Sequence, residues 1–139
     1  MPIGVTTNAP LNIFNGTNRP NVVAGVDWRA PMAGDEFNPR VDRFLNRAAF
    51  VQPVGELGNA PRINGDVRRF WNLNENMSLA KSIKAGGKLD VDVRVEAFNV
   101  FNRVIWGAPN TDFSSNNFGL ITAVANTPRQ MQLGLKLYW

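Results

Sequence analysis

A two-residue alternation of apolar and polar side chains constrains the fold of this chain more than any other feature. Within residues 89–97 every second side chain is apolar, namely Leu89, Val91, Val93, Val95 and Ala97. The side chains between them are charged, namely Asp90, Asp92, Arg94 and Glu96. Successive side chains of a β-strand point to opposite faces, so the pattern predicts a strand with one apolar face.

Residues 71–83 show the same alternation, interrupted by Glu75 and Lys81. The intervening residues 84–88 contain Gly86-Gly87, which predicts a tight turn and therefore a β-hairpin. Its arms run to about ten residues or more, whereas strands of soluble proteins usually have five or six. Strands of about nine to eleven residues span membranes in β-barrels. The alternation fits two folds: a barrel whose apolar face meets lipid, and a soluble sandwich whose charged row faces water.

The last ten residues repeat the pattern and end on an aromatic side chain. Apolar side chains occupy alternate positions, namely Met131, Leu133, Leu135, Leu137 and Trp139. An aromatic residue at a strand end suits the aromatic girdle at a membrane interface. The soluble alternative is a closing strand whose last side chain caps a core.

The first part of the chain, residues 1–66, has the composition of loops. Pairs such as Asn15-Gly16 and Asn38-Pro39 favour turns. Apolar residues at 41, 44, 45 and 48 follow a helical period and predict a short helix over 41–49. We therefore expect one segment, 1–139, of all-β class: irregular loops in 1–66, and long antiparallel hairpins in 67–139 that form part of a barrel or an open sheet.

Residue types that are missing exclude several chemistries. The chain has no Cys and no His, which rules out disulfides, zinc-thiolate sites, Ser-His-Asp triads and imidazole metal ligands. The net charge is +4, and the arginines are scattered rather than clustered with aromatic residues as nucleic-acid binding would require. We expect no metal, no cofactor and no nucleic-acid partner.

Two sequence features of membrane-targeted chains are missing from these residues. No run of eighteen apolar residues is present, so no transmembrane helix is expected. Residues 1–5 lack the basic start and apolar core of a signal peptide. We expect that any targeting information lies in a longer precursor.

The C-terminal segment resembles the β-signal of bacterial outer-membrane proteins. The matching residues are Gln132, Gly134, Leu137 and Trp139. The resemblance implies that the barrel-assembly machinery reads this segment. The terminal Trp departs from the commoner Phe.

A second resemblance covers most of the chain. Residues 94–102, Arg-Val-Glu-Ala-Phe-Asn-Val-Phe-Asn, resemble the penultimate-strand motif of TonB-dependent receptors. They are most similar to the Oar-like group, which carries an N-terminal carboxypeptidase-regulatory-like domain. Further segments resemble the same group in the same order, namely 19–21, 44–50, 58–62, 118–122 and 128–132.

The resemblance implies the last strands and outer loops of a barrel of about 22 strands in the bacterial outer membrane. The implied role is to close the barrel and display ligand-contacting loops of a transport protein, without catalysis. These 139 residues contain no plug domain and no energy-coupling box. About four strands cannot close a barrel, so we expect a longer precursor in outer-membrane lipid, or self-association through strand edges.

Two other functions stay open. The loop aromatics Trp28, Phe37 and Trp106 could stack on a carbohydrate or hold a peptide in a soluble or self-assembling β-rich protein, or simply pin the loops. Asp90 and Asp92 would lie about 7 Å apart on one strand face, a spacing that suits an inverting glycoside hydrolase. An ordinary charged face with internal ion pairs explains the same two carboxylates.

Overall fold

The chain is all-β and forms two compact units. The computed structural model describes residues 1–9 and 17–139, so the turn expected at Asn15-Gly16 lies outside the described residues. The loop unit comprises Met1–Phe70 with Gly107–Ala123, and the sheet unit comprises Trp71–Trp106 with Val124–Trp139. The expected boundary after residue 66 stays a prediction, and in the structure the loop unit continues to Phe70 before the sheet unit begins. Residues 107–123, expected in the β part, instead belong to the loop unit.

Seven strands and one helical turn are present in the described residues. In chain order they are β1 (Pro2–Ile3), β2 (Asn21–Val22), the 3₁₀ helix η1 (Arg47–Ala49), β3 (Phe50–Val51), β4 (Asn64–Arg68), β5 (Met77–Lys84), β6 (Asp90–Phe98) and β7 (Gln130–Tyr138). All strand pairs are antiparallel, and within the described residues the sheets do not close into a barrel. No helix in the described part of the chain has the length and apolar character needed to cross a membrane.

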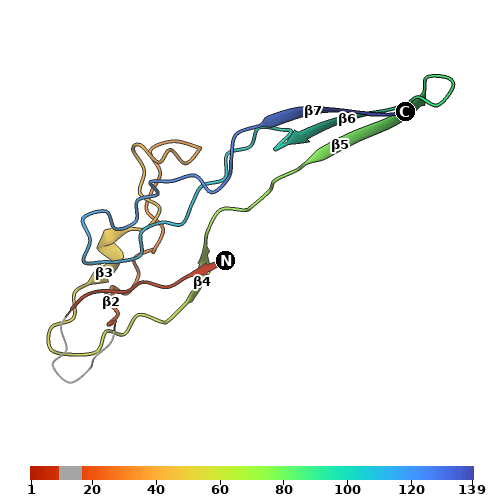
Figure 1. Cartoon of the computed structure of the whole chain (residues 1–139). Helices are drawn as coiled ribbons and strands as arrows, with labels where there is room; N and C mark the ends of the chain where they lie inside the picture. Colours follow the sequence, from red (N-terminus) through yellow and green to blue (C-terminus); the bar gives the residue numbers. More distant parts are fainter. Residues whose placement is uncertain (10–16) are drawn as a thin grey trace. The chain divides into compact units, whose positions relative to one another are not determined.

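The loop unit is held together by an aromatic core rather than by long strands. Its two sheets, β1–β4 and β2–β3, have two strands each (Figure 1). The ring of Phe50 lies 4.7 Å from that of Trp28, 5.5 Å from Phe118 and 6.0 Å from Phe113. Because Phe113, Phe118 and the buried Ile121 all come from residues 107–123, this segment folds with the loop unit.

The predicted helix over 41–49 is wrong except for its last three residues, which form η1. The backbone N–H of Phe44 donates to the carbonyl of Gly119 (2.7 Å), and that of Asn46 donates to Trp28 (2.8 Å). These bonds to distant segments take the place of the bonds within a helix. Val41, expected on the buried face, is exposed. The turn expected at Asn38-Pro39 is confirmed, since the N–H of Val41 donates to the carbonyl of Asn38.

The sheet unit contains the predicted hairpin and adds the C-terminal strand to it. Strand β6 lies between β5 and β7 (Figure 1). Gly86 and Gly87 both have positive φ in the turn between β5 and β6, a conformation that glycine adopts without steric cost. The first arm is shorter than predicted: β5 begins at Met77 rather than Trp71, because beyond Ala97 the partner strand turns away at Asn99.

Candidate functional site

One face of the three-stranded sheet is apolar and uncovered. The register aligns Leu79, Val95 and Leu133 in one row across the sheet, and the rows beside it follow the same pattern. The face consists of Met77, Leu79, Lys81, Ile83, Val91, Val93, Val95, Ala97, Met131, Leu133, Leu135 and Leu137. Lys81 is its single polar member. Leu79 and Leu133 are each 74% exposed, so the middle of this face is open to solvent within the described residues.

The opposite face is polar and internally paired. Asp92 of β6 stands in register with Ser82 of β5 and Lys136 of β7. The guanidinium of Arg94 lies 3.4 Å from the carboxylate of Glu96, which also accepts a 2.9 Å hydrogen bond from the side chain of Gln132. Such polar pairs, along β6 and between β6 and β7, are those of a hydrated sheet face.

The carboxylates of the glycosidase alternative, Asp90 and Asp92, both lie on this polar face. Asp90 stands opposite Lys84 of β5 and Tyr138 of β7. Each carboxylate therefore stands opposite a lysine of a neighbouring strand, Asp90 opposite Lys84 and Asp92 opposite Lys136. Among the described residues, no group of three or more acidic side chains could hold a metal ion.

The residues of the predicted assembly signal are divided between the two faces of the sheet. Gln132 and Gly134 lie on the polar face, where Gly134 is opposite Arg94, with 3.8 Å between its ideal Cβ position and the Cβ of Arg94. Leu137 lies on the apolar face in register with Val91. Trp139 follows the last residue of β7 and is 93% exposed. The four residues therefore form one continuous strand end rather than a pocket.

Both outer edges of this sheet are open within the described part of the chain. There, β5 pairs with β6, β7 pairs with β6, and neither has a second partner. An unpaired strand edge presents a row of N–H and C=O groups that can pair with another strand. The sheet unit is therefore complementary to further β-strands on both sides.

A buried asparagine organises the end of the sheet where β6 leaves it. Asn99 is 1% exposed and has φ of 49°, a left-handed conformation that Asn tolerates. Its side-chain amide donates to the carbonyls of Arg103 (2.9 Å) and Thr127 (3.0 Å). Its side-chain oxygen accepts from the N–H of Arg103 (2.9 Å), and its own N–H donates to the side chain of Asn76 (3.0 Å).

Neighbouring residues extend this asparagine hub. Asn102, also at positive φ, accepts from the N–H of Arg129 through its side chain (3.2 Å). Asn126 bonds both to the N–H of Ile105 (2.9 Å) and to the carbonyl of Arg103 (2.7 Å). The guanidinium of Arg103 lies 3.3 Å from the carboxylate of Glu75. The hub thus ties the segments before β5, after β6 and before β7 to one another.

Sequence reasoning assigned no role to this hub, although Asn99 and Asn102 lie in the segment that carries the receptor resemblance. Two signals could have revealed it. The repeat Phe98-Asn99 and Phe101-Asn102 places two turn-forming residues directly after a strand. Glu75 interrupts an apolar face, which calls for a nearby cation.

The loop aromatics predicted as ligand contacts are packed in the structure. Trp28 is 6% exposed and meets Phe50 edge-on, so it is part of the loop-unit core and offers no stacking surface. Phe37 is half-buried, 5.0 Å from the ring of Phe70. Trp106 is half-buried and forms an isolated antiparallel bridge with Val124 in the sheet unit. Trp106 belongs to the sheet unit, whereas Trp28 and Phe37 belong to the loop unit.

Comparisons with known proteins give one match. A family model described as an outer membrane beta barrel domain matches residues 1–132. This range includes all of the loop unit and most of the sheet unit, and stops inside β7. No curated protein and no solved structure matches the chain.

Proposed function

The chain belongs to the family of outer membrane β-barrel domains, and from this premise we propose that it forms the C-terminal part of a TonB-dependent receptor-like protein of the Oar-like group. In this role β5, β6 and β7 are wall strands that help to close the barrel in the bacterial outer membrane. The loop unit is displayed by the barrel and contacts the transported ligand. The chain takes no part in catalysis.

The observation that carries this proposal is the exposed apolar face of the sheet unit. A soluble protein rarely leaves a contiguous apolar face of this kind in water. In a membrane barrel, lipid covers the outward apolar side chains while polar side chains face the lumen. Leu79 and Leu133 would then face lipid, and Asp92 and Arg94 would face the lumen.

The open edges of β5 and β7 support the same role. Unpaired backbone groups are too costly in lipid, so membrane sheets close on themselves. Further strands of a longer precursor would pair with both edges. We propose that Gln132, Gly134, Leu137 and Trp139 are the part of β7 that the barrel-assembly machinery recognises.

Deletion of Trp139 in the full-length precursor tests the assembly role. We expect the deletion to lower the fraction of protein folded in the outer membrane, measured by heat-modifiable migration of isolated membranes. Trp139→Phe is the matched control, because Phe is the residue that the β-signal resemblance leads one to expect, and it should insert normally. Unchanged insertion of the deletion variant would show that Trp139 is not a signal.

The same open edges favour a second candidate function, a self-assembling β-rich protein. Copies of this chain could pair β7 with β5 of the next copy and so cover each other's edges. Light scattering of the 139-residue chain separates the possibilities. A monodisperse monomer in buffer without detergent would contradict both membrane insertion and self-assembly, and would favour a soluble binding module.

A further inference from the structure

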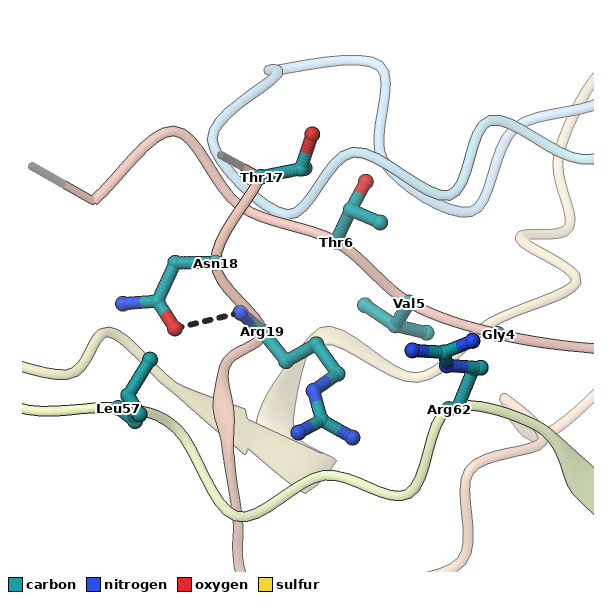
Figure 2. A pocket seen from close by; sticks show the side chains of 8 residues that line it. All are labelled: Gly4, Val5, Thr6, Thr17, Asn18, Arg19, Leu57 and Arg62. Carbon is teal, nitrogen blue, oxygen red and sulfur yellow. Dashed lines mark hydrogen bonds between the residues drawn. The ribbon is translucent and has the colours of Figure 1, made fainter. Parts of the chain in front are cut away.

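The loop unit contains a hollow that the barrel role does not explain. Its volume is about 430 Å³, and its walls include Val5, Asn18 and Leu57 (Figure 2). The side chains of Arg19 and Arg62 extend into it from opposite sides, as Figure 2 shows. Pockets for small organic ligands begin at about 300 Å³, so the hollow is large enough for one.

Close backbone contacts hold the main chain of both arginines. A Cβ on Gly4 would lie 2.1 Å from the carbonyl oxygen of Arg62, and a Cβ on Gly58 would lie 1.7 Å from that of Arg19. Both distances are impossible for a real side chain, so glycine is required at these two positions. The backbone of each arginine is therefore packed directly against a neighbouring segment.

A buried asparagine adds to this support. The side-chain oxygen of Asn18 accepts from the N–H of Arg19 (2.8 Å) and of Gly58 (3.2 Å), and its amide donates to the carbonyl of Glu56 (3.1 Å). Asn18 is 4% exposed and has partners for both ends of its amide. It thus fixes the backbone at Arg19 instead of acting as a ligand contact itself.

The two guanidinium groups lack a counter-charge. Among the described residues neither has a side-chain hydrogen bond or an ion pair. Residues 10–16, which follow the β1 segment, contain no Asp or Glu. The carboxylate of the nearby Glu56 accepts a hydrogen bond from the side chain of Asn21 (2.8 Å). Two cations therefore share one hollow, and within the described residues no carboxylate pairs with either of them.

We propose that this hollow binds a small organic oxyanion, with Arg19 and Arg62 holding its carboxylate or phosphate group. The planar guanidinium fork matches both groups and forms strong charge-assisted hydrogen bonds with them. Val5 and Leu57 give the hollow apolar wall on which an attached hydrocarbon part of the ligand packs. The inference rests on the loop-display part of the proposed function and adds a ligand class to it.

The test uses three probes with the same ring: benzoate, phenyl phosphate and the neutral benzamide. Each is titrated into the ¹⁵N-labelled 139-residue chain in detergent micelles, and the Nε–Hε resonances of the arginines are followed by NMR. We expect benzoate or phenyl phosphate to shift the resonances of Arg19 and Arg62 with saturation, and benzamide to leave them unchanged. The anion that binds more tightly shows whether the hollow prefers a carboxylate or a phosphate group.

Charge-matched variants complete the design. Arg19→Gln and Arg62→Gln should each weaken anion binding roughly tenfold or more, the loss expected when a charge-assisted hydrogen bond disappears. Arg40→Gln removes the same charge from an exposed loop position outside the hollow and should bind as the unchanged chain does.

Two results would overturn the inference: equal binding of benzamide and the anions, or equal losses in all three arginine variants. Insertion of the full-length precursor into lipid vesicles, measured in parallel, separates this failure from failure of the barrel role. If the precursor inserts but the chain binds no anion, only the anion-binding role of the hollow is contradicted. If the chain binds the anion but the full-length precursor does not insert, the barrel role alone is contradicted.

Discussion

The loop unit and the sheet unit treat apolar side chains in opposite ways. In the loop unit, Phe118 and Leu45 are fully buried, and the aromatic rings of Phe50 and Phe113 pack against Phe118. In the sheet unit, the apolar face that contains Leu79 and Leu133 is open. Burial of apolar area is the main favourable contribution to folding, so only the loop unit obtains it from its own residues.

This difference shows where each unit finds its stability. The loop unit has a core of its own and resembles the interior of a water-soluble protein. The sheet unit has backbone pairing and an asparagine hub, but its apolar side chains need an external apolar phase. Lipid in a barrel is the phase we propose, and a second copy of the chain is the alternative.

The largest expected effect is the loss of an aromatic ring from the loop-unit core. Phe118→Ala should destabilise the loop unit by about 3–5 kcal/mol, because the cavity removes contacts with Phe50 and Phe113. Hydrogen exchange at the amide of Phe44, which donates to Gly119, measures this loss. Val54→Ala, at an exposed site, is the control. If the Phe44 amide exchanges at the same rate in Phe118→Ala and in Val54→Ala, the stability of the loop unit does not depend on this aromatic core.

A charge on the apolar face of the sheet unit should have the next largest effect. Leu133→Arg should cost about 2–4 kcal/mol of membrane stability if this residue faces lipid near the midplane. Gln130→Arg, on the polar face of the same strand and outside the proposed assembly residues, should cost much less. The folded fraction in vesicles along a urea titration measures both. Equal costs would remove the distinction between a lipid face and a lumen face.

Removal of the side chain of Asn99, at the centre of the asparagine hub, should have the third largest effect on stability. Asn99→Ala leaves the part-buried N–H of Arg103 without its side-chain acceptor and should cost about 1–3 kcal/mol in the sheet unit. Exchange of the Arg103 amide should quicken accordingly. Asn74→Ala, at an exposed position in the same unit, should change it little. Unchanged exchange in Asn99→Ala would mean that other contacts order this end of the sheet.

The smallest effect concerns pH and the loop unit alone. Hydrogen bonds from the N–H groups of Asn38 (2.8 Å) and Ala33 (2.9 Å) hold the pKa of Asp42 below its usual value of 3.8. A lowered folded-state pKa stabilises the fold above pH 3.8, and this contribution disappears as pH falls through the folded-state pKa. Hydrogen exchange of the loop-unit amides, measured as the pH is lowered, should show this loss of stability. In the Asp42→Asn variant the exchange should no longer show it. If the unchanged chain and the Asp42→Asn variant show the same pH dependence of hydrogen exchange, the stabilising role of the Asp42 carboxylate is contradicted.

Local periodicity predicted the sheet unit well because its contacts follow the alternation of the strands. The turn at Gly86-Gly87 and the faces of β6 and β7 could be read directly from the order of side chains. The open edges could not be read in this way, since they depend on which strands find partners. The asparagine hub was missed because its partners lie up to 28 residues away.

The loop unit was predicted less well because its structure depends on contacts between distant segments. A helical period at 41–48 was overridden by bonds from Phe44 to Gly119 and from Asn46 to Trp28. Trp28 was expected to contact ligand, but it packs against Phe50, which is 22 residues away in sequence. The hollow with Arg19 and Arg62 likewise joins segments that no local pattern connects.

Spin labels along β7 test the central claim most directly. These 139 residues contain no native Cys, so single cysteines at successive positions from Met131 to Leu137 can each carry one label in the full-length precursor, after replacement of any cysteine elsewhere in it. In phospholipid vesicles, oxygen collides more often with labels in lipid, and a water-soluble nickel complex collides more often with labels in water. We predict high oxygen accessibility at 131, 133, 135 and 137 and low values at the residues between them. A flat profile, or one of the opposite phase, would contradict a lipid-facing apolar sheet.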